Sequence, residues 1–149
     1  MSPFVFLKVI HVLAAIVAVG ANVSYAFWLR TASHDRDRLT WAIQGVRRLD
    51  RRVANPGYVV LLVTGVLMVS TGAYSFADRW LQLAIVLYAL AAVVGISAFA
   101  PAIRRQLAEA ERDPLSPAYA AAARRATGLG LFTTGLVVVI VILMVAKPF

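Results

Sequence analysis

Cysteine is absent from the chain, which excludes disulfides, thiolate metal sites and thiol catalysis. Acidic residues are scarce, seven against fifteen lysines and arginines, and none lies inside the long apolar stretches. Because proton-coupled transporters usually need carboxylates within the membrane, this disfavours such a transporter. The sequence also lacks a Walker loop, a zinc motif, paired buried carboxylates and a Ser-His-Asp set, and its three methionines are too few for a copper path. These absences leave open whether the protein is an enzyme.

Hydrophobic residues make up 61% of the chain and dominate four stretches. The stretches cover approximately residues 4–29, 57–72, 80–100 and 127–146. About 20 apolar residues span the hydrocarbon core of a bilayer as a helix. We therefore predict an all-α fold, a single integral membrane domain over residues 1–149 in which four transmembrane helices form an up-down-up-down bundle. The first stretch is longer than the apolar region of a signal peptide and is predicted to be a retained helix.

Further helical segments are predicted next to the spans. The segment Leu39–Ala54 carries apolar residues at helical spacing among arginines, which indicates an amphipathic helix at the interface or at the start of the second span. The sequence Asn55-Pro56-Gly57 predicts a break or kink, and because the stretch 57–72 is short we expect the second span to begin before the proline. Residues Ile103–Glu111 are expected to extend the third span as a charged helix.

The basic residues are distributed unevenly between the connections. Twelve of the fifteen basic residues lie in residues 30–52 and 101–126, whereas the connection 73–79 holds only two charged residues, Asp78 and Arg79. The positive-inside rule places the two arginine-rich connections in the cytoplasm and both termini outside. The net charge of +8 is therefore attributed to membrane orientation and to anionic lipid head groups, and not to nucleic-acid binding.

Polar and sulfur-containing side chains are predicted to gather in the outer half of the bundle. His11 lies seven residues past Phe4, roughly 10 Å below the outer boundary at about 1.5 Å per residue. Tyr88 is expected near the same depth. The outer half then collects Lys8, His11, Met68, Gln82, Tyr88 and Met144. The inner half is expected to hold far fewer polar side chains.

An intramembrane histidine is a candidate functional residue. A neutral imidazole is a common ligand of haem iron and methionine is a known axial partner, so His11 could hold a b-type haem with Met68, Met144 and Tyr88 nearby and Lys8 paired with a propionate. The alternative is a histidine bonded to a neighbouring helix or anchored near the membrane interface, with the methionines as packing residues. The second axial ligand stays open, and another His11 from a symmetry-related copy would complete a bis-histidine site in a homodimer.

Several short motifs carry a resemblance to known membrane proteins. The sequence Phe6-Leu7-Lys8-Val9-Ile10-His11 resembles the start of the first helix in a group of small bacterial membrane proteins. The group includes the haem-associated, oxygen-independent protoporphyrinogen oxidase family and an uncharacterised family of predicted integral membrane proteins of about this length. The further matching stretches are Arg48-Leu49-Asp50 with Asn55-Pro56, Arg79-Trp80-Leu81, and Met144-Val145-Ala146-Lys147-Pro148-Phe149.

The resemblance implies a location in the bacterial cytoplasmic membrane and, for the oxidase family, haem ligation at His11. That family also has a lysine early in its third helix, after a tryptophan. Here the stretch reads Trp80-Leu81-Gln82-Leu83, without a lysine, so the uncharacterised family is the closer match. Two functions follow as hypotheses: a haem or porphyrin protein for electron transfer or porphyrin-related redox chemistry, or a non-catalytic accessory subunit or small-molecule carrier in which His11 packs between helices.

Overall fold

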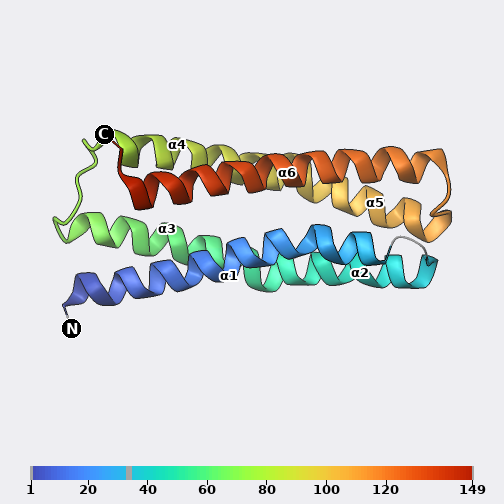
Figure 1. Ribbon diagram of the computed structural model, residues 1–149, viewed down its shortest axis with the longest axis horizontal. Helices are drawn as coiled ribbons and strands as arrows, with labels where there is room; N and C mark the ends of the chain where they lie inside the picture. The colour runs from blue at the N-terminus through green and yellow to red at the C-terminus, as the bar shows by residue number, and fades with distance from the viewer. Residues whose placement is uncertain (1, 33–34, 149) are drawn as a thin grey trace.

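Four long helices make up the protein (Figure 1). The computed structural model describes residues 2–32 and 35–148. The first long helix is α1 (Pro3–Thr31) and the last is α6 (Pro117–Ala146). The second joins α2 (Arg36–Leu49), η1 (Asp50–Ala54) and α3 (Asn55–Ser70), and the third joins α4 (Arg79–Val94), η2 (Gly95–Phe99) and α5 (Ala100–Arg112). Within the described residues all regular structure is helical, as predicted.

The four long helices contain 29, 35, 34 and 30 residues, and each is apolar enough to cross a membrane. At 1.5 Å per residue they are roughly 44–52 Å long, which exceeds a hydrocarbon core of about 30 Å. Figure 1 shows successive helices running in opposite directions, with the N- and C-termini at one end of the bundle. We call this the terminal end, and the opposite end, where α2 and α5 lie, the α2–α5 end. The predicted four-helix bundle is confirmed.

Side-chain caps explain where three of the long helices begin. Ser2 Oγ accepts a hydrogen bond from the Val5 amide at 3.3 Å, and Pro3 opens α1. Ser116 Oγ does the same for α6 at 3.1 Å, with Pro117 as the first helical residue. The Asp35 carboxylate accepts from two amides of the first turn of α2. These caps satisfy amide groups that have no partner inside the helix, and proline is favoured at the first position because it has no amide to satisfy.

The two inner prolines, Pro56 and Pro101, lie within continuous helices. Each follows a π-helical turn, η1 before Pro56 and η2 before Pro101. The residue before each proline donates its amide five residues back, Asn55 to the carbonyl of Asp50 and Ala100 to the carbonyl of Gly95. A proline lacks an amide and crowds the carbonyl four residues earlier, and a local π turn helps to satisfy the backbone groups that the proline frees. Of the predicted break or kink at Asn55-Pro56-Gly57, the break is wrong because the helix is continuous, and the second span begins before the proline as predicted.

The most tightly packed core lies toward the α2–α5 end. Leu39 and Ile43 of α2 are at most 1% exposed, and Ile103, Leu107 and Ala110 of α5 join the same buried cluster. Large apolar side chains elsewhere face outward, among them Ile16 at 63%, Val86 at 62% and Ile96 at 77% exposed. Such apolar exposure is unfavourable in water and favourable against lipid chains. The amphipathic segments predicted for α2 and α5 are thus helical extensions whose apolar sides pack together.

Candidate functional site

His11 lies on the face of α1 that packs against α3. Its Nδ1 is 2.8 Å from the hydroxyl of Thr64, which is only 6% exposed. One glycine of α3 allows a close approach to α1, because a Cβ at Gly57 would lie 3.1 Å from Ala18 Cβ. A Cβ at Gly65 would make an ordinary contact of 3.5 Å with His11 Cε1. Small residues at helix crossings are the usual way in which membrane helices approach closely. The histidine is therefore held at a tight helix–helix contact and is itself only half-buried.

The hydrogen bonds around Thr64 define the tautomer of His11. Thr64 Oγ1 is 2.7 Å from the carbonyl oxygen of Val60, which can only accept. The Thr64 hydroxyl has one proton, which it donates to the Val60 carbonyl if that contact is a hydrogen bond. The contact with His11 is then a hydrogen bond only when Nδ1–H donates to Oγ1. The lone pair of the neutral ring is then on Nε2. A histidine that ligates a metal through Nε2 and donates its other N–H to a fixed acceptor has this arrangement.

The other predicted site residues lie in different environments. Lys8 is exposed, Met68 is 7% exposed on α3 and Met144 is partly buried on α6. Met68 is one turn from Thr64 on the same face of α3, toward the terminal end. Across the described residues, no hydrogen bond joins these three side chains to His11, and no cluster of three or more His, Cys, Asp or Glu side chains is found. His34, expected to be a solvated loop residue, lies outside the described residues.

Tyr88 reaches a different level of the bundle. Its hydroxyl donates to the carbonyl oxygen of Tyr58 at 2.8 Å. Tyr58 is six residues from Thr64 along α3, about 9 Å nearer the α2–α5 end. Gln82, the other polar residue predicted here, donates to the carbonyl oxygen of Phe76 at 3.0 Å and so binds to the loop.

A second polar layer joins α1, α3 and α4 toward the α2–α5 end. The Asn22 amide donates to the Tyr58 hydroxyl, and the Asn55 amide donates to Asp50 at 3.3 Å. The hydroxyl of Tyr25 is buried, and it interacts with the carboxylate of Asp50. The prediction that this half holds far fewer polar side chains is therefore wrong. A signal was available, because Asn22 and Tyr25 lie three residues apart on the inward face of α1.

The continuous helix from Arg36 to Ser70 places one carboxylate, Asp50, inside a membrane-crossing helix. Asp50 lies outside the apolar stretch 57–72 but inside the helix that crosses the membrane, in the π turn η1. It is half-buried. The sequence predicted that the second span begins before the proline but not how far before it, so it did not place Asp50 within the span.

An aromatic and basic cluster closes the terminal end. Lys147 Nζ donates to the Tyr74 hydroxyl at 2.9 Å and lies 4.2 Å from the centre of the Tyr74 ring and 5.5 Å from that of Trp80. The Tyr74 ring packs edge-on against Phe4 and Trp80, with centroids 5.7 and 5.4 Å away. Aromatic and basic side chains gather in this way at membrane–water interfaces. This cluster links both termini to the loop between α3 and α4.

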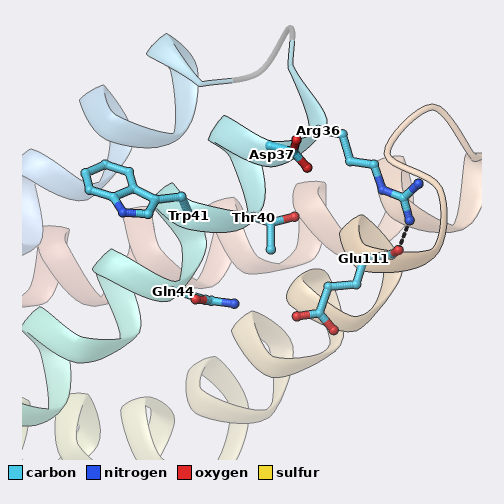
Figure 2. Close-up of a pocket in the computed structure, with 6 residues that line it drawn as sticks. All are labelled: Arg36, Asp37, Thr40, Trp41, Gln44 and Glu111. Carbon is cyan, nitrogen blue, oxygen red and sulfur yellow. Dashed lines mark hydrogen bonds between the residues drawn. The ribbon is translucent and has the colours of Figure 1, made fainter.

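A charged surface pocket lies between α2 and α5 at the other end (Figure 2). Its lining residues are Arg36, Asp37, Thr40, Trp41, Gln44 and Glu111. The Arg36 guanidinium donates to the backbone carbonyls of Glu111 and Arg112, where α5 ends. A cation at a helix C-terminus satisfies free carbonyls and interacts favourably with the helix dipole. The pocket is explained by this capping contact between α2 and α5.

Four crossing helices, lipid-facing apolar surfaces and interfacial aromatic clusters define a multi-pass integral membrane protein. More particularly, residues 5–148 match the model of a family described as "Predicted integral membrane protein (DUF2269)", and the chain belongs to that family. The expected membership of an uncharacterised membrane protein family is confirmed. The chain has no match among curated proteins or solved structures.

Proposed function

We propose that the protein holds a b-type haem or related porphyrin through His11 and serves electron transfer or porphyrin-related redox chemistry. The observation that supports this most strongly is the hydrogen bond between His11 Nδ1 and Thr64 Oγ1, 2.8 Å long, in an intramembrane setting. With Nδ1–H as the donor, this bond orients the imidazole and leaves Nε2 with the lone pair that a metal ligand needs. A fixed neutral imidazole in a low-dielectric setting is a suitable ligand for haem iron.

The surrounding residues fit such a group in part. Met68 is buried one turn from Thr64 and supplies a thioether on the same face of α3. Lys8 is exposed one turn before His11 and would pair with a propionate, and Met144 and Tyr88 are the remaining candidates for the cofactor's environment. A bound haem would supply a one-electron change at its iron. The chain's own contribution is to orient the ligand through Thr64 and to exclude water from it.

A second candidate function is a non-catalytic accessory subunit or small-molecule carrier. The same hydrogen bond favours it, because a histidine and a threonine that bond across a helix contact also stabilise the bundle. The absence of a lysine in the stretch 80–85, early in the third helix where the oxidase family carries one after a tryptophan, agrees with this candidate.

Haemin titration of the detergent-purified protein distinguishes the two candidates. Replacing His11 with Ala should abolish the Soret shift that binding produces. Thr64→Val should weaken haemin binding about 10- to 100-fold, because it removes the partner that orients the ligand. Thr64→Ser retains the hydroxyl and should bind as the wild type does. His34→Ala removes the only other histidine and should have no effect. A Soret shift that survives His11→Ala would overturn the haem proposal.

We also propose that α2 and α5 face the cytoplasm of a bacterial inner membrane and that both termini lie outside. The arginine content of residues 30–52 and 101–126 supports this orientation. The same arginines are proposed to contact anionic lipid head groups. Dimerisation through a second His11 would supply the other axial ligand if Met68 does not.

A further inference from the structure

The bundle is loosely packed between α3 and α4. Helix α3 packs on α1, and α6 packs on α4, with Cα atoms within 8 Å of each other, but no described Cα atom of α3 lies within 8 Å of α4 or α6. Packed helices have axes roughly 8–10 Å apart, which brings many of their Cα atoms within this distance. The bundle therefore consists of two helix pairs, α1–α3 and α4–α6, and these pairs do not pack closely along α3.

Two bridges join the helix pairs, one on each side of the His11–Thr64 contact. Toward the α2–α5 end, the Tyr88 hydroxyl of α4 donates to the carbonyl oxygen of Tyr58 on α3. No other described hydrogen bond joins α3 to α4 or α6. At the terminal end, the pairs are joined by the terminal cluster, which consists of Phe4, Tyr74, Trp80 and Lys147.

Tyr74 is the centre of the terminal cluster. It belongs to the loop between α3 and α4, which crosses from one helix pair to the other in Figure 1. Its ring packs edge-on against Phe4 of α1 at 5.7 Å and against Trp80 of α4 at 5.4 Å. Its hydroxyl accepts a hydrogen bond of 2.9 Å from Lys147 at the end of α6. One side chain thus connects both helix pairs, through contacts that are individually weak and reversible.

The backbone of Lys147 is held in a conformation that lysine rarely adopts. With φ 43° and ψ 59° it lies in the left-handed region, and it is the only residue other than glycine with a positive φ in the described part of the chain. Many helices end with such a residue, but glycine is preferred there because it has no Cβ to strain the backbone. A strained residue persists where its surroundings hold it, and here Nζ contacts Tyr74 and Trp80. Loss of these contacts would therefore favour release of Lys147.

The terminal cluster lies above the face of α1 that carries His11. Phe4 and His11 are seven residues apart on one side of this helix, about 10 Å along its axis. The His11–Thr64 contact is therefore between the terminal cluster and the Tyr58–Tyr88 bond. If the helix pairs separate from the terminal end, the opening reaches His11 before it reaches that bond.

We propose that the terminal cluster is a latch that holds the two helix pairs together, and that its release lets α3 and α4 separate and admits a ligand to His11. The closed arrangement is the major state, and the open arrangement is a minor state that loss of the latch populates. The Tyr58–Tyr88 bond and the buried core toward the α2–α5 end stay in place during the movement. That the ligand is haem or a related porphyrin rests on the proposed function, whereas the opening itself does not.

Distances between spin labels test the latch. Because the chain has no cysteine, labels can be placed by Leu67→Cys on α3 and Leu83→Cys on α4, both exposed positions. Double electron–electron resonance in lipid nanodiscs should give one narrow distance distribution when the latch is intact. Tyr74→Ala should add a population with a distance roughly 5 Å longer, about half the diameter of a helix. A second label pair at Arg47→Cys and Ala108→Cys, exposed positions on α2 and α5, should keep its distance.

Matched variants separate the latch from a general effect on the loop. Phe76→Ala removes an exposed aromatic ring from the same loop, and because Phe76 is outside the terminal cluster the α3–α4 distance should not change. Lys147→Gly removes the lysine and relieves the left-handed backbone, so it opens the latch without adding strain and should also add the longer population. Unchanged distances in both latch variants, or an equal change in Phe76→Ala, would overturn the latch.

The rate of haemin association tests access to His11. Tyr74→Ala should raise this rate roughly tenfold or more, because a state that is minor in the wild type becomes populated. An unchanged rate together with a longer α3–α4 distance would overturn the proposed access to His11. If neither the wild type nor any variant binds haemin, the haem proposal fails, and the spin-label distances still decide whether the latch exists.

Discussion

Replacing Thr64 with Val should destabilise the bundle through its effect on His11. The substitution keeps the shape of the side chain and removes the acceptor of the 2.8 Å hydrogen bond from Nδ1. Interhelical hydrogen bonds in membrane proteins contribute about 0.6 kcal/mol on average and up to about 1.7 kcal/mol. Removing one partner of a fully buried pair costs roughly 1–3 kcal/mol, and the lower part of this range applies because His11 is only half-buried. We therefore expect Thr64→Val to lower the free energy of unfolding by about 1–2 kcal/mol.

A double-mutant cycle with His11→Leu isolates the interaction. In the His11→Leu background Thr64→Val should cost little, which gives a coupling free energy of about 1 kcal/mol. The measurement is unfolding by sodium dodecyl sulfate in mixed micelles, followed by circular dichroism. Thr133→Val is a matched control, because among the described residues Thr133 Oγ1 bonds only to carbonyls of its own helix, Leu129 and Gly130, both at 3.0 Å. A coupling near zero, or equal costs at positions 64 and 133, would refute the assignment of this hydrogen bond.

The remaining predictions concern orientation and packing. Because the chain has no cysteine, single cysteines can be introduced and labelled one at a time. On intact cells a membrane-impermeant maleimide should label Ala73→Cys, and it should label Leu115→Cys only after permeabilisation. The reverse pattern would mean that the proposed orientation is inverted. Gly45→Ala should raise stability by about 0.5–1 kcal/mol, whereas Gly57→Ala should lower it, since its Cβ would meet a side chain of α1 at 3.1 Å; thermal unfolding that ranks them the other way would contradict the packing described. Tyr58→Phe removes the hydrogen-bond partner of a buried amide and should cost about 1 kcal/mol in the same assay.

The sequence predicted the helices well because hydrophobic length alone defines a membrane span. The stretch 127–146, for example, lies entirely within α6. Charge and proline signals predicted helix ends less well, since Pro56 and Pro101 are accommodated by π turns that no sequence pattern marks. Proline is expected to break a helix because it lacks an amide. This expectation leaves out the packing of neighbouring helices, which can keep a proline-containing segment helical in a membrane.

The site was predicted only in part. His11 was identifiable because a histidine inside an apolar stretch is unusual, but its partner Thr64 was not, because threonine is common in membrane helices and only the pairing of α1 with α3 brings the two together. Depth estimates from residue counts also could not predict that the Tyr88 hydroxyl reaches the carbonyl of Tyr58. Side chains of this length reach more than one turn along a neighbouring helix, so residue rise alone does not determine the level at which they bond.

The absorption spectrum of the detergent-purified protein, from a host supplied with haem, tests the central claim most directly. The account predicts a Soret band in the oxidised protein and sharpened α and β bands after reduction with dithionite, all absent from the His11→Ala variant. A spectrum without a chromophore, from folded wild-type protein expressed in the haem-supplied host, would contradict the haem proposal and favour the accessory or carrier function.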